Sequence, residues 1–211
     1  LEGEKYFTWT SEKDGWRHLY KVSRDGKSES LITKGDFDVM SISCIDPKGG
    51  YVYYLASPHS AIDRYLYRSR LDGKGEAERV TPEGEAGYHG YNISGNAQYA
   101  LHTFQNSTTP TVYEMISLKK HQTIKVMQDN RALKERYDSL GLSPKEFFRV
   151  DIGEAILDGW MIKPKNFDPA KKYPVIFHIY GEPASSTVLN TWSSNDMWHQ
   201  FLAQQGYIIM S

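Results

Sequence analysis

The chain has 211 residues and a mass of 24.2 kDa, and its 25 lysines and arginines nearly balance 26 aspartates and glutamates. A chain of this length forms one or two domains. The balanced charge argues against binding to nucleic acid or to an anionic membrane surface. Mean hydropathy is −0.58, and no apolar run approaches the roughly 18 residues that a membrane span needs.

The two ends of the sequence predict that it is a piece of a longer protein. It opens with "LEGEKYFTWT", which has neither an initiator Met nor the basic and apolar regions of a signal peptide. It closes with "GYIIMS", inside what reads as an apolar strand. The aromatic content of 13%, with 15 Tyr and 5 Trp, favours strands, because aromatic side chains suit a half-buried pleated surface.

One pattern repeats three times in the first part of the chain. Each copy has an aromatic strand, a polar turn, a strand centred on Leu-Tyr or Val-Tyr, a second turn and a last strand. Tyr20, Tyr67 and Tyr113 hold equivalent places and lie 47 and 46 residues apart. This spacing is close to the ~40 to 50 residues of a propeller blade. The three copies are residues 5–34, 50–82 and 97–128.

Residues 1–128 are therefore predicted to be the C-terminal blades of a β-propeller, about three sheets of four short antiparallel strands. The stretches "SRDGKS" and "RLDGKG" place Asp-Gly between strand-like runs, which is a strong hairpin signal. Because propellers typically close with four to eight blades, we expect further blades upstream. We expect the repeated tyrosines to pack between blades; they are Tyr6, Tyr20, Tyr53, Tyr67, Tyr99 and Tyr113.

The cysteine and the histidines of the repeats do not suggest a metal site or a cofactor. Cys44 is the only cysteine, so no internal disulfide forms, and we expect a small buried apolar side chain. No two of the histidines have the spacing of a metal site such as H-x-x-x-H. We expect them to be hydrogen-bonded or exposed; they are His18, His59, His89, His102 and His121.

After the repeats, residues 129–145 are predicted to form a helical linker. Asp129 and Asn130 provide an N-cap signal, good helix formers follow, and Gly141 and Pro144 end the helix. The linker therefore separates the repeats from a segment of a different kind.

Residues 146–211 are predicted to begin an α/β sheet. "EFFRVDIG" and "AILDGWMIKP" form an antiparallel hairpin. "VIFHIY" is an unbroken apolar strand of the kind buried on both faces of a sheet. "SSNDMWHQFLAQQG" is a helix with Met197, Trp198, Phe201 and Leu202 on one face, and "YIIMS" is a second buried strand. A right-handed crossover is expected between Val175 and Tyr207.

The loop after "VIFHIY" carries the candidate chemistry. In an α/β-hydrolase the third strand ends in a loop that supplies part of the oxyanion hole. The phenol of Tyr180 can donate a hydrogen bond to an oxyanion. Gly181 allows the backbone to approach a substrate, and Pro183 stiffens the exit. A buried structural tyrosine is the alternative interpretation of Tyr180.

The order of these elements and the series "FDPAKKYPVIFHIYGEP" resemble the prolyl oligopeptidase family of serine peptidases, within it the dipeptidyl peptidase IV branch. The resemblance covers essentially the whole chain. It implies that Tyr180 serves the oxyanion hole and that Gly181, Glu182 and Pro183 form the substrate loop. The acylaminoacyl peptidase branch usually has His-Gly-Gly-Pro here. Glu182 departs from the family pattern, which has glycine or another small residue at that place.

The sequence contains no G-x-S-x-G, the turn that presents the serine nucleophile in such enzymes. The family's nucleophile, acid and base are therefore expected after Ser211, and the chain should be inactive alone. Four nearby residues are not expected to form a triad, because a serine in a loop before the first helix has no activating turn: Ser185, Ser186, Asp196 and His199.

The resemblance implies a full-length serine exopeptidase that releases Xaa-Pro or Xaa-Ala dipeptides from peptides with a free N-terminus. Two alternatives stay open. The parent could be a non-catalytic propeller that binds peptides or partners, or an endopeptidase or acylaminoacyl peptidase of the same family. A homodimer and a bacterial periplasmic or secreted location are compatible with the resemblance, and the sequence decides neither.

Overall fold

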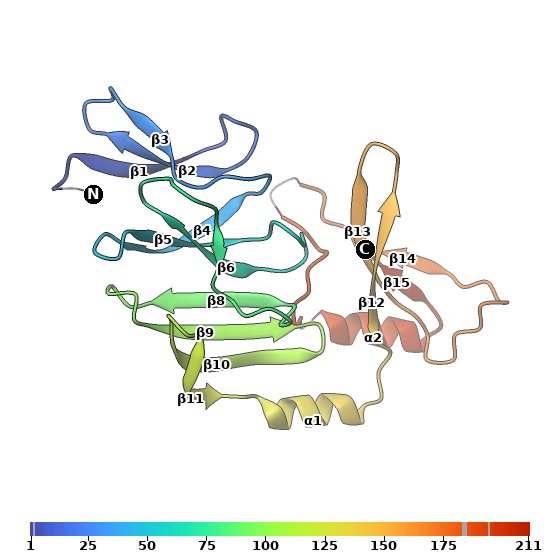
Figure 1. Ribbon diagram of the computed structural model, residues 1–211. Helices are drawn as coiled ribbons and strands as arrows, with labels where there is room; N and C mark the ends of the chain where they lie inside the picture. Colours follow the sequence, from blue (N-terminus) through green and yellow to red (C-terminus); the bar gives the residue numbers. More distant parts are fainter. Residues whose placement is uncertain (2, 183–184, 194) are drawn as a thin grey trace. The chain divides into compact units, whose positions relative to one another are not determined.

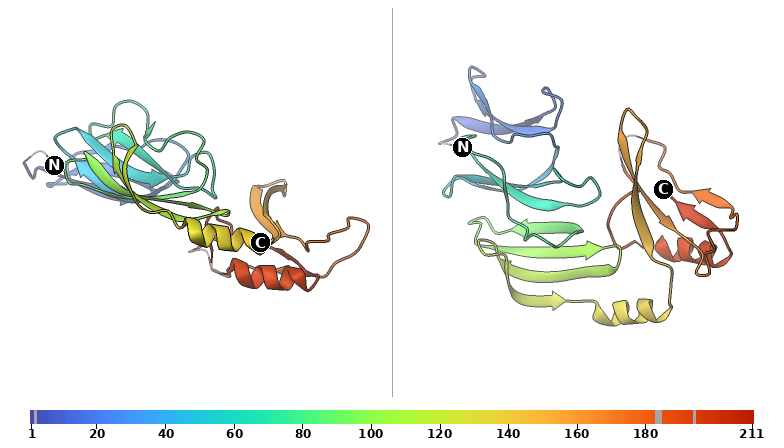
Figure 2. Two further views of the ribbon diagram at one scale, coloured as in Figure 1. Left: turned by 90° about the horizontal axis from the view of Figure 1, so that it is seen from below. Right: turned by 45° about the vertical axis from the view of Figure 1, so that its right-hand side comes forward.

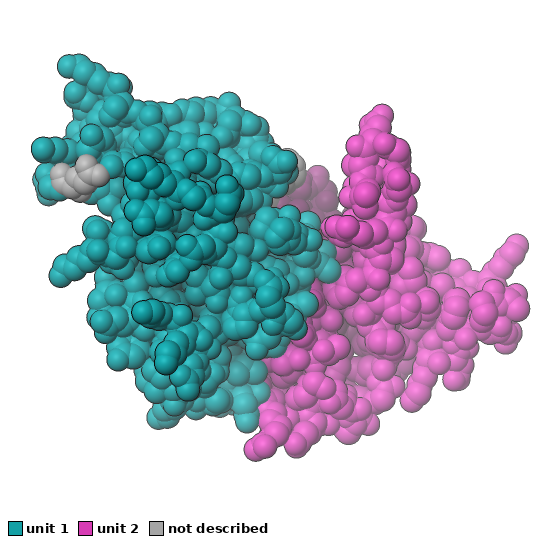
Figure 3. Space-filling model, viewed as in Figure 1, with its two compact units in different colours: residues 1–104, 112–129 teal, residues 105–111, 130–211 magenta. Residues whose placement is uncertain are grey.

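The computed structural model describes residues 1, 3–182, 185–193 and 195–211 (Figure 1). It divides into two compact units (Figure 3). The first unit contains residues 1–104 and 112–129, and the second contains residues 105–111 and 130–211. The predicted domain boundaries at residues 128 and 145 stay predictions.

The first unit is built from antiparallel strands in three sheets, within the residues described. The first sheet has three strands rather than the predicted four, and the second and third have four each, with neighbours in chain order. The strands are β1 (Tyr6–Ser11), β2 (His18–Ser23), β3 (Glu29–Leu31), β4 (Val39–Asp46), β5 (Tyr51–Ala56), β6 (Tyr65–Arg70), β7 (Glu78–Arg79), β8 (Tyr88–Ile93), β9 (Tyr99–Asn106), β10 (Thr109–Ser117) and β11 (Gln122–Gln128). The tip of the β9–β10 hairpin belongs to the second unit.

Consecutive sheets of the first unit pack face to face (Figure 2). Side chains alternate between the two faces of a strand, so in β5 Tyr54 faces the first sheet and Tyr53 faces the third. Tyr54 lies in a core cluster with Leu19 and Ile32. Tyr53 lies in a second cluster with residues of the third sheet, namely Ile93, Ala100, Ile116 and Leu118. The middle sheet is therefore buried on both faces.

The repeated tyrosines follow this packing only in part. Tyr53 and Tyr67 are buried between sheets as predicted. Tyr20 is also buried, but its contacts are with Lys13 and Asp14 in the turn between β1 and β2. The prediction is wrong for Tyr99 and Tyr113, which are 49% and 46% exposed. Both side chains lie on the face of the third sheet that no other described sheet covers.

Two smaller expectations for the first unit are also settled. Cys44 is half-buried rather than fully buried, and its Sγ lies 3.9 Å from the Ser94 carbonyl oxygen. The Asp-Gly turns form as predicted. Gly73 has a φ of +68°, and a Cβ there would lie 2.3 Å from the Leu31 carbonyl oxygen, so no other residue fits that position without a shift of the backbone.

The second unit combines one mixed sheet with two helices. The sheet order is β12-β13-β15-β14. The predicted hairpin is confirmed, with β12 and β13 antiparallel. β14 and β15 run parallel, and α2 lies between them in the chain. The elements are α1 (Arg131–Ser139), β12 (Lys145–Asp151), β13 (Ile156–Ile162), β14 (Val175–Phe177), α2 (Asp196–Gln204) and β15 (Ile208–Met210).

Three local expectations for the second unit are corrected. β14 is short and lies at the edge of the sheet, so Val175 and Phe177 are 45% and 67% exposed instead of buried on both faces. The apolar face of α2 is exposed at Met197, Trp198 and Phe201, while the face that packs inward is largely polar. Asn130 precedes α1, but its side chain makes no capping bond and donates instead to the Thr111 carbonyl oxygen at 2.7 Å.

Candidate functional site

Tyr180 lies just beyond the parallel pair β14–β15. The pairing continues past β14, because the His178 N–H donates to the Met210 carbonyl oxygen at 2.8 Å. Two residues later the Tyr180 side chain is 49% exposed. It is therefore not the buried structural tyrosine of the alternative interpretation, and its phenol is accessible at the end of a strand.

The predicted loop residues beside Tyr180 differ in what the structure says of them. The Tyr180 hydroxyl donates to Glu182 Oε2 at 3.4 Å, and Glu182 is exposed. An added Cβ at Gly181 would meet no atom of the described residues within 4 Å. Pro183 lies outside the described residues. Among the described residues, this end of the loop therefore has a contact between a phenol and a carboxylate.

Further along, the loop is fastened to the sheet. The Trp160 indole N–H donates to the Thr187 carbonyl oxygen at 2.9 Å, and the hydroxyls of Thr187 and Ser211 lie 2.6 Å apart. Trp160 itself is 2% exposed and exchanges backbone hydrogen bonds of 2.9 and 3.0 Å with Ser211. Val188 packs against the same core. The loop that begins at Tyr180 is therefore anchored seven residues later.

The inward face of α2 holds a buried ion pair. Lys145 Nζ lies 2.8 Å from Asp196 Oδ2, and the two side chains are only 8% and 9% exposed. The ammonium also lies 5.2 Å from the centroid of the Trp160 ring. Gln200, one turn further along α2, pairs with the backbone of Ser143, accepting from its N–H at 3.1 Å and donating to its carbonyl oxygen at 2.7 Å.

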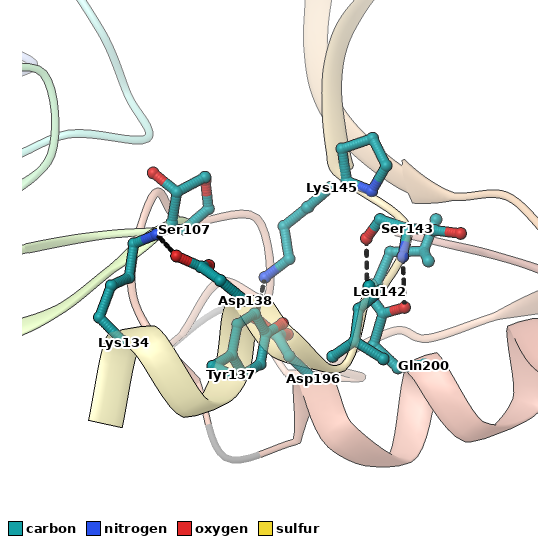
Figure 4. Close-up of a pocket in the computed structure, with 13 residues that line it drawn as sticks. Ser107, Lys134, Tyr137, Asp138, Leu142, Ser143, Lys145, Asp196 and Gln200 are labelled. Carbon is teal, nitrogen blue, oxygen red and sulfur yellow. Dashed lines mark hydrogen bonds and ion pairs between the residues drawn. The ribbon is translucent and has the colours of Figure 1, made fainter. Parts of the chain in front are cut away.

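These contacts surround a hollow of about 250 Å³ (Figure 4). The ion pair of Lys145 with Asp196 and the two hydrogen bonds of Gln200 lie on its wall, and an exposed pair of Lys134 with Asp138 lies on α1. These charged side chains are paired with one another, so they connect α1, β12 and α2 around the hollow and are not free to act as catalytic groups.

A second hollow, of about 200 Å³, lies between the fastened loop and α2. His178 and His199 line it with their ring centroids 4.9 Å apart. Burial, together with the nearby His178, lowers the pKa of His199. Within the described part of the chain, the buried His199 Nδ1 has no hydrogen-bond partner, and it lies 3.8 Å from Asp196 Oδ1.

The structure gives contacts for three of the four residues that were not expected to form a triad, namely Ser186, Asp196 and His199. Asp196 is paired with Lys145 and lies 3.8 Å from His199, too far for a hydrogen bond. The Ser186 hydroxyl accepts from the Val188 N–H at 3.2 Å. Within the described residues, no group of three or more His, Cys, Asp or Glu side chains is arranged to hold a metal ion.

Sequence spacing missed one cluster in the first unit. His89, His102 and Glu114 come from the consecutive strands β8, β9 and β10 and form a hydrogen-bonded chain with distances of 2.9 and 2.8 Å. His121 joins the cluster through Tyr91, at 2.7 Å. The sequence signal was one polar residue at an inward-facing position of each strand. That these positions are neighbours becomes visible only once the strand register is known.

Comparison with known proteins identifies the family. Residues 1–111 match the model of the dipeptidyl peptidase IV (DPP IV) N-terminal region. Dipeptidyl peptidase 4 of Arthroderma otae is 32% identical over 199 residues, and that of Trichophyton rubrum is 31% identical. The crystal structure of Porphyromonas gingivalis dipeptidyl peptidase 4 superposes with a TM-score of 0.87 at 32% identity, covering 97% of this chain and 28% of that chain.

The chain therefore belongs to the dipeptidyl peptidase IV family, within the prolyl oligopeptidase family of serine peptidases, as its sequence predicts. The predicted fold, a partial β-propeller followed by the start of an α/β sheet, is confirmed. The two fungal matches cover 93% of this chain but only 25% of each relative, so the chain spans about a quarter of their length. No helix among the described residues is long and apolar enough to cross a membrane.

The buried ion pair of α2 gives a prediction about stability. Asp196→Ala leaves the Lys145 ammonium buried without a partner, which typically costs about 3 to 5 kcal/mol. The matched control Asp138→Ala opens an exposed pair, worth about 1 kcal/mol or less. Urea unfolding of both variants measures the difference in the free energy of unfolding.

A further variant separates the lost pairing from lost packing. Replacing both partners, Lys145→Met with Asp196→Leu, removes the unpaired charge and should recover much of the stability. Equal losses in Asp196→Ala and Asp138→Ala would contradict a stabilising role for the buried pair.

Proposed function

We propose that this chain is part of a longer serine exopeptidase that releases Xaa-Pro or Xaa-Ala dipeptides from the N-termini of peptides. The similarity to proteins named dipeptidyl peptidase 4 over almost the whole chain supports this proposal. In it, residues 1–128 are the last propeller blades, residues 129–145 a linker and residues 146–211 the start of the peptidase domain. Because the sequence has no G-x-S-x-G, the serine nucleophile, the acid and the base come from elsewhere in the protein, and the 211 residues alone do not cleave peptides.

The accessible phenol of Tyr180 is the observation that carries the catalytic part of the proposal. When the serine attacks the scissile carbonyl carbon, negative charge develops on the carbonyl oxygen. A preorganised O–H donor lowers the energy of that state more than the energy of the bound substrate. The pairing of β14 with β15 and the fastening of the loop at Thr187 hold the backbone on either side of the phenol. Gly181, Glu182 and Pro183 line the path of the substrate in this proposal.

The substrate class is tested with the full-length protein and two dipeptidyl anilides that differ only in an acetyl group on the amino terminus. The proposal expects release of the anilide from the free form and little from the blocked form. Equal cleavage of the two forms would indicate an endopeptidase or an acylaminoacyl peptidase. Failure to label with a fluorophosphonate, together with no cleavage, would indicate a non-catalytic binding protein.

The role of Tyr180 is tested by Tyr180→Phe, which removes the hydroxyl and keeps the ring. Loss of one oxyanion donor typically lowers kcat by about 10²- to 10³-fold, and KM should change little because the donor acts mainly in the transition state. Tyr173→Phe is the control, since the Tyr173 hydroxyl accepts from the Asp168 N–H in the preceding loop and has no part in the proposed oxyanion hole. An unchanged kcat in Tyr180→Phe removes this residue from the mechanism.

A further inference from the structure

Glu182 places a negative charge beside the proposed oxyanion donor. Its Oε2 lies 3.4 Å from the Tyr180 hydroxyl oxygen, which is long for a hydroxyl-to-carboxylate hydrogen bond. Both side chains are exposed, and among the described residues Glu182 has no ion-pair partner. The contact is therefore weak as a hydrogen bond, but its electrostatic effect on a nearby developing charge remains.

An ionised carboxylate here opposes the reaction that Tyr180 assists. Charge of the same sign within several ångströms raises the energy of an oxyanion, so Glu182 without a counter-charge would slow the attack on the substrate. A cation supplied by the substrate next to the scissile bond reverses this effect. In an Xaa-Pro or Xaa-Ala substrate, the residue before the bond has no charged side chain. The nearest side chain that can carry a positive charge belongs to the first residue of the leaving peptide.

We propose that Glu182 is a specificity-determining residue that makes the enzyme favour peptides with Lys or Arg as the first residue after the scissile bond. This inference rests on the proposed function. For two solvent-exposed charges about 6 Å apart, with an effective dielectric constant of about 40 to 80, the effect amounts to about three- to tenfold in kcat/KM, and it weakens as salt screens exposed charges.

The test uses the full-length protein and three peptides that share their first two residues and carry Lys, Gln or Glu at the third position. The wild-type protein should cleave the Lys peptide about three- to tenfold faster than the Gln peptide in kcat/KM, with the Glu peptide slowest. In Glu182→Gln the three values should converge. Glu154→Gln, at an exposed glutamate in the turn between β12 and β13, is the control for the change in net charge and should keep the wild-type order.

The outcomes separate this inference from the proposed function. Absence of dipeptide release from all three peptides contradicts the proposed function itself. If dipeptides are released without a preference for Lys, or if Glu182→Gln keeps that preference, the role of Glu182 is overturned. Neither outcome contradicts the exopeptidase activity. Tyr180→Phe should slow all three peptides by a similar factor, because it removes a donor and no charge.

An independent observation concerns the histidine chain of the first unit. His89 Nε2 lies 3.0 Å from the Glu85 carbonyl oxygen, His89 Nδ1 lies 2.9 Å from His102 Nε2, and His102 Nδ1 lies 2.8 Å from Glu114 Oε1. Both rings are almost completely buried, at 1% and 2% exposure. The chain therefore has three consecutive contacts to rings that are shielded from solvent, where polar groups are normally hydrogen-bonded.

Counting protons shows that neutral rings cannot satisfy this chain. A peptide carbonyl and a carboxylate only accept hydrogen bonds, and a neutral imidazole carries one N–H. Three contacts need three protons, and two neutral rings supply two. We infer that this chain binds one additional proton in the folded protein, held between His102 and Glu114.

The surroundings favour the Glu114 end as the site of the additional proton. Burial lowers the pKa of His89 to about 4, so that ring stays neutral. Burial lowers the pKa of His102 overall, although the Glu114 carboxylate opposes that shift. Burial raises the pKa of Glu114, but its hydrogen bonds with His102 and Thr123 lower that pKa overall. The additional proton is therefore inferred from the three contacts and their donors rather than from these shifts. Other titratable or charged groups facing the chain are Tyr65 of β6, Arg79 of β7, Glu85 before β8, Tyr91 of β8 and His121 between β10 and β11.

Glu114→Gln supplies a matched variant. Its amide N–H can donate to His102 Nδ1, while its carbonyl oxygen can accept from the Thr123 hydroxyl, which lies 2.7 Å from Glu114 Oε2. All contacts are then satisfied by neutral groups. An unfolded chain releases the additional proton above a pH of about 6.5, so the native protein binds more protons than the unfolded one and loses stability as the pH rises.

Amide hydrogen exchange of β8 to β10, compared between the two proteins at each pH, tests the inference. From pH 7 to pH 9 the protection of the wild type should fall relative to Glu114→Gln, by up to about tenfold per pH unit, while the ratio for β1 to β3 stays constant. A ratio for β8 to β10 that does not change with pH overturns it. So does NMR evidence at pH 7 that His102 is neutral while Glu114 is ionised.

Discussion

The pairing of β15 with two different strands is the interaction on which the second unit depends. β15 is antiparallel to β13, with Ile162 opposite Ile209, and parallel to β14, with Ile176 opposite Ile209. Ile209 is completely buried at the centre of this arrangement. β14 runs parallel to β15 and forms the edge of the sheet. The chain therefore leaves the sheet at this edge, where Tyr180 is exposed.

In the second unit, polar groups hold the loop after Tyr180 and also line the inward face of α2, where a helix usually presents apolar side chains. Trp160 connects the core to the loop, since its ring packs in the core while its indole N–H holds the loop at Thr187. The same ring lies near the ammonium of Lys145, whose partner Asp196 begins α2. Hydrogen bonds and an ion pair thus decide which face of α2 packs inward. Such polar contacts need closer geometric matching than apolar contacts do.

In the first unit, the constraint is that the middle sheet lies between two other sheets and must present an apolar face to each of them. Alternation along β5 solves it, with Tyr53 and Tyr54 on opposite faces. In the third sheet the same alternation brings His89 and His102 inward beside each other. Buried polar groups are costly unless every donor and acceptor is paired, which explains why these rings are linked in a continuous chain.

Local periodicity and turn chemistry are enough to predict most of the elements and their order, including the repeat, the Asp-Gly turns, the β12–β13 hairpin and the two helices, though not the number of strands in the first sheet. The sequence also pointed to Tyr180 through a family motif. Tertiary structure alone decided that β14 is an exposed edge strand, that α2 packs inward through Asp196 and His199, and that histidines 13 residues apart touch. These outcomes depend on which strands become neighbours, and strand neighbours are set by contacts between residues distant in the chain, which local pattern does not encode.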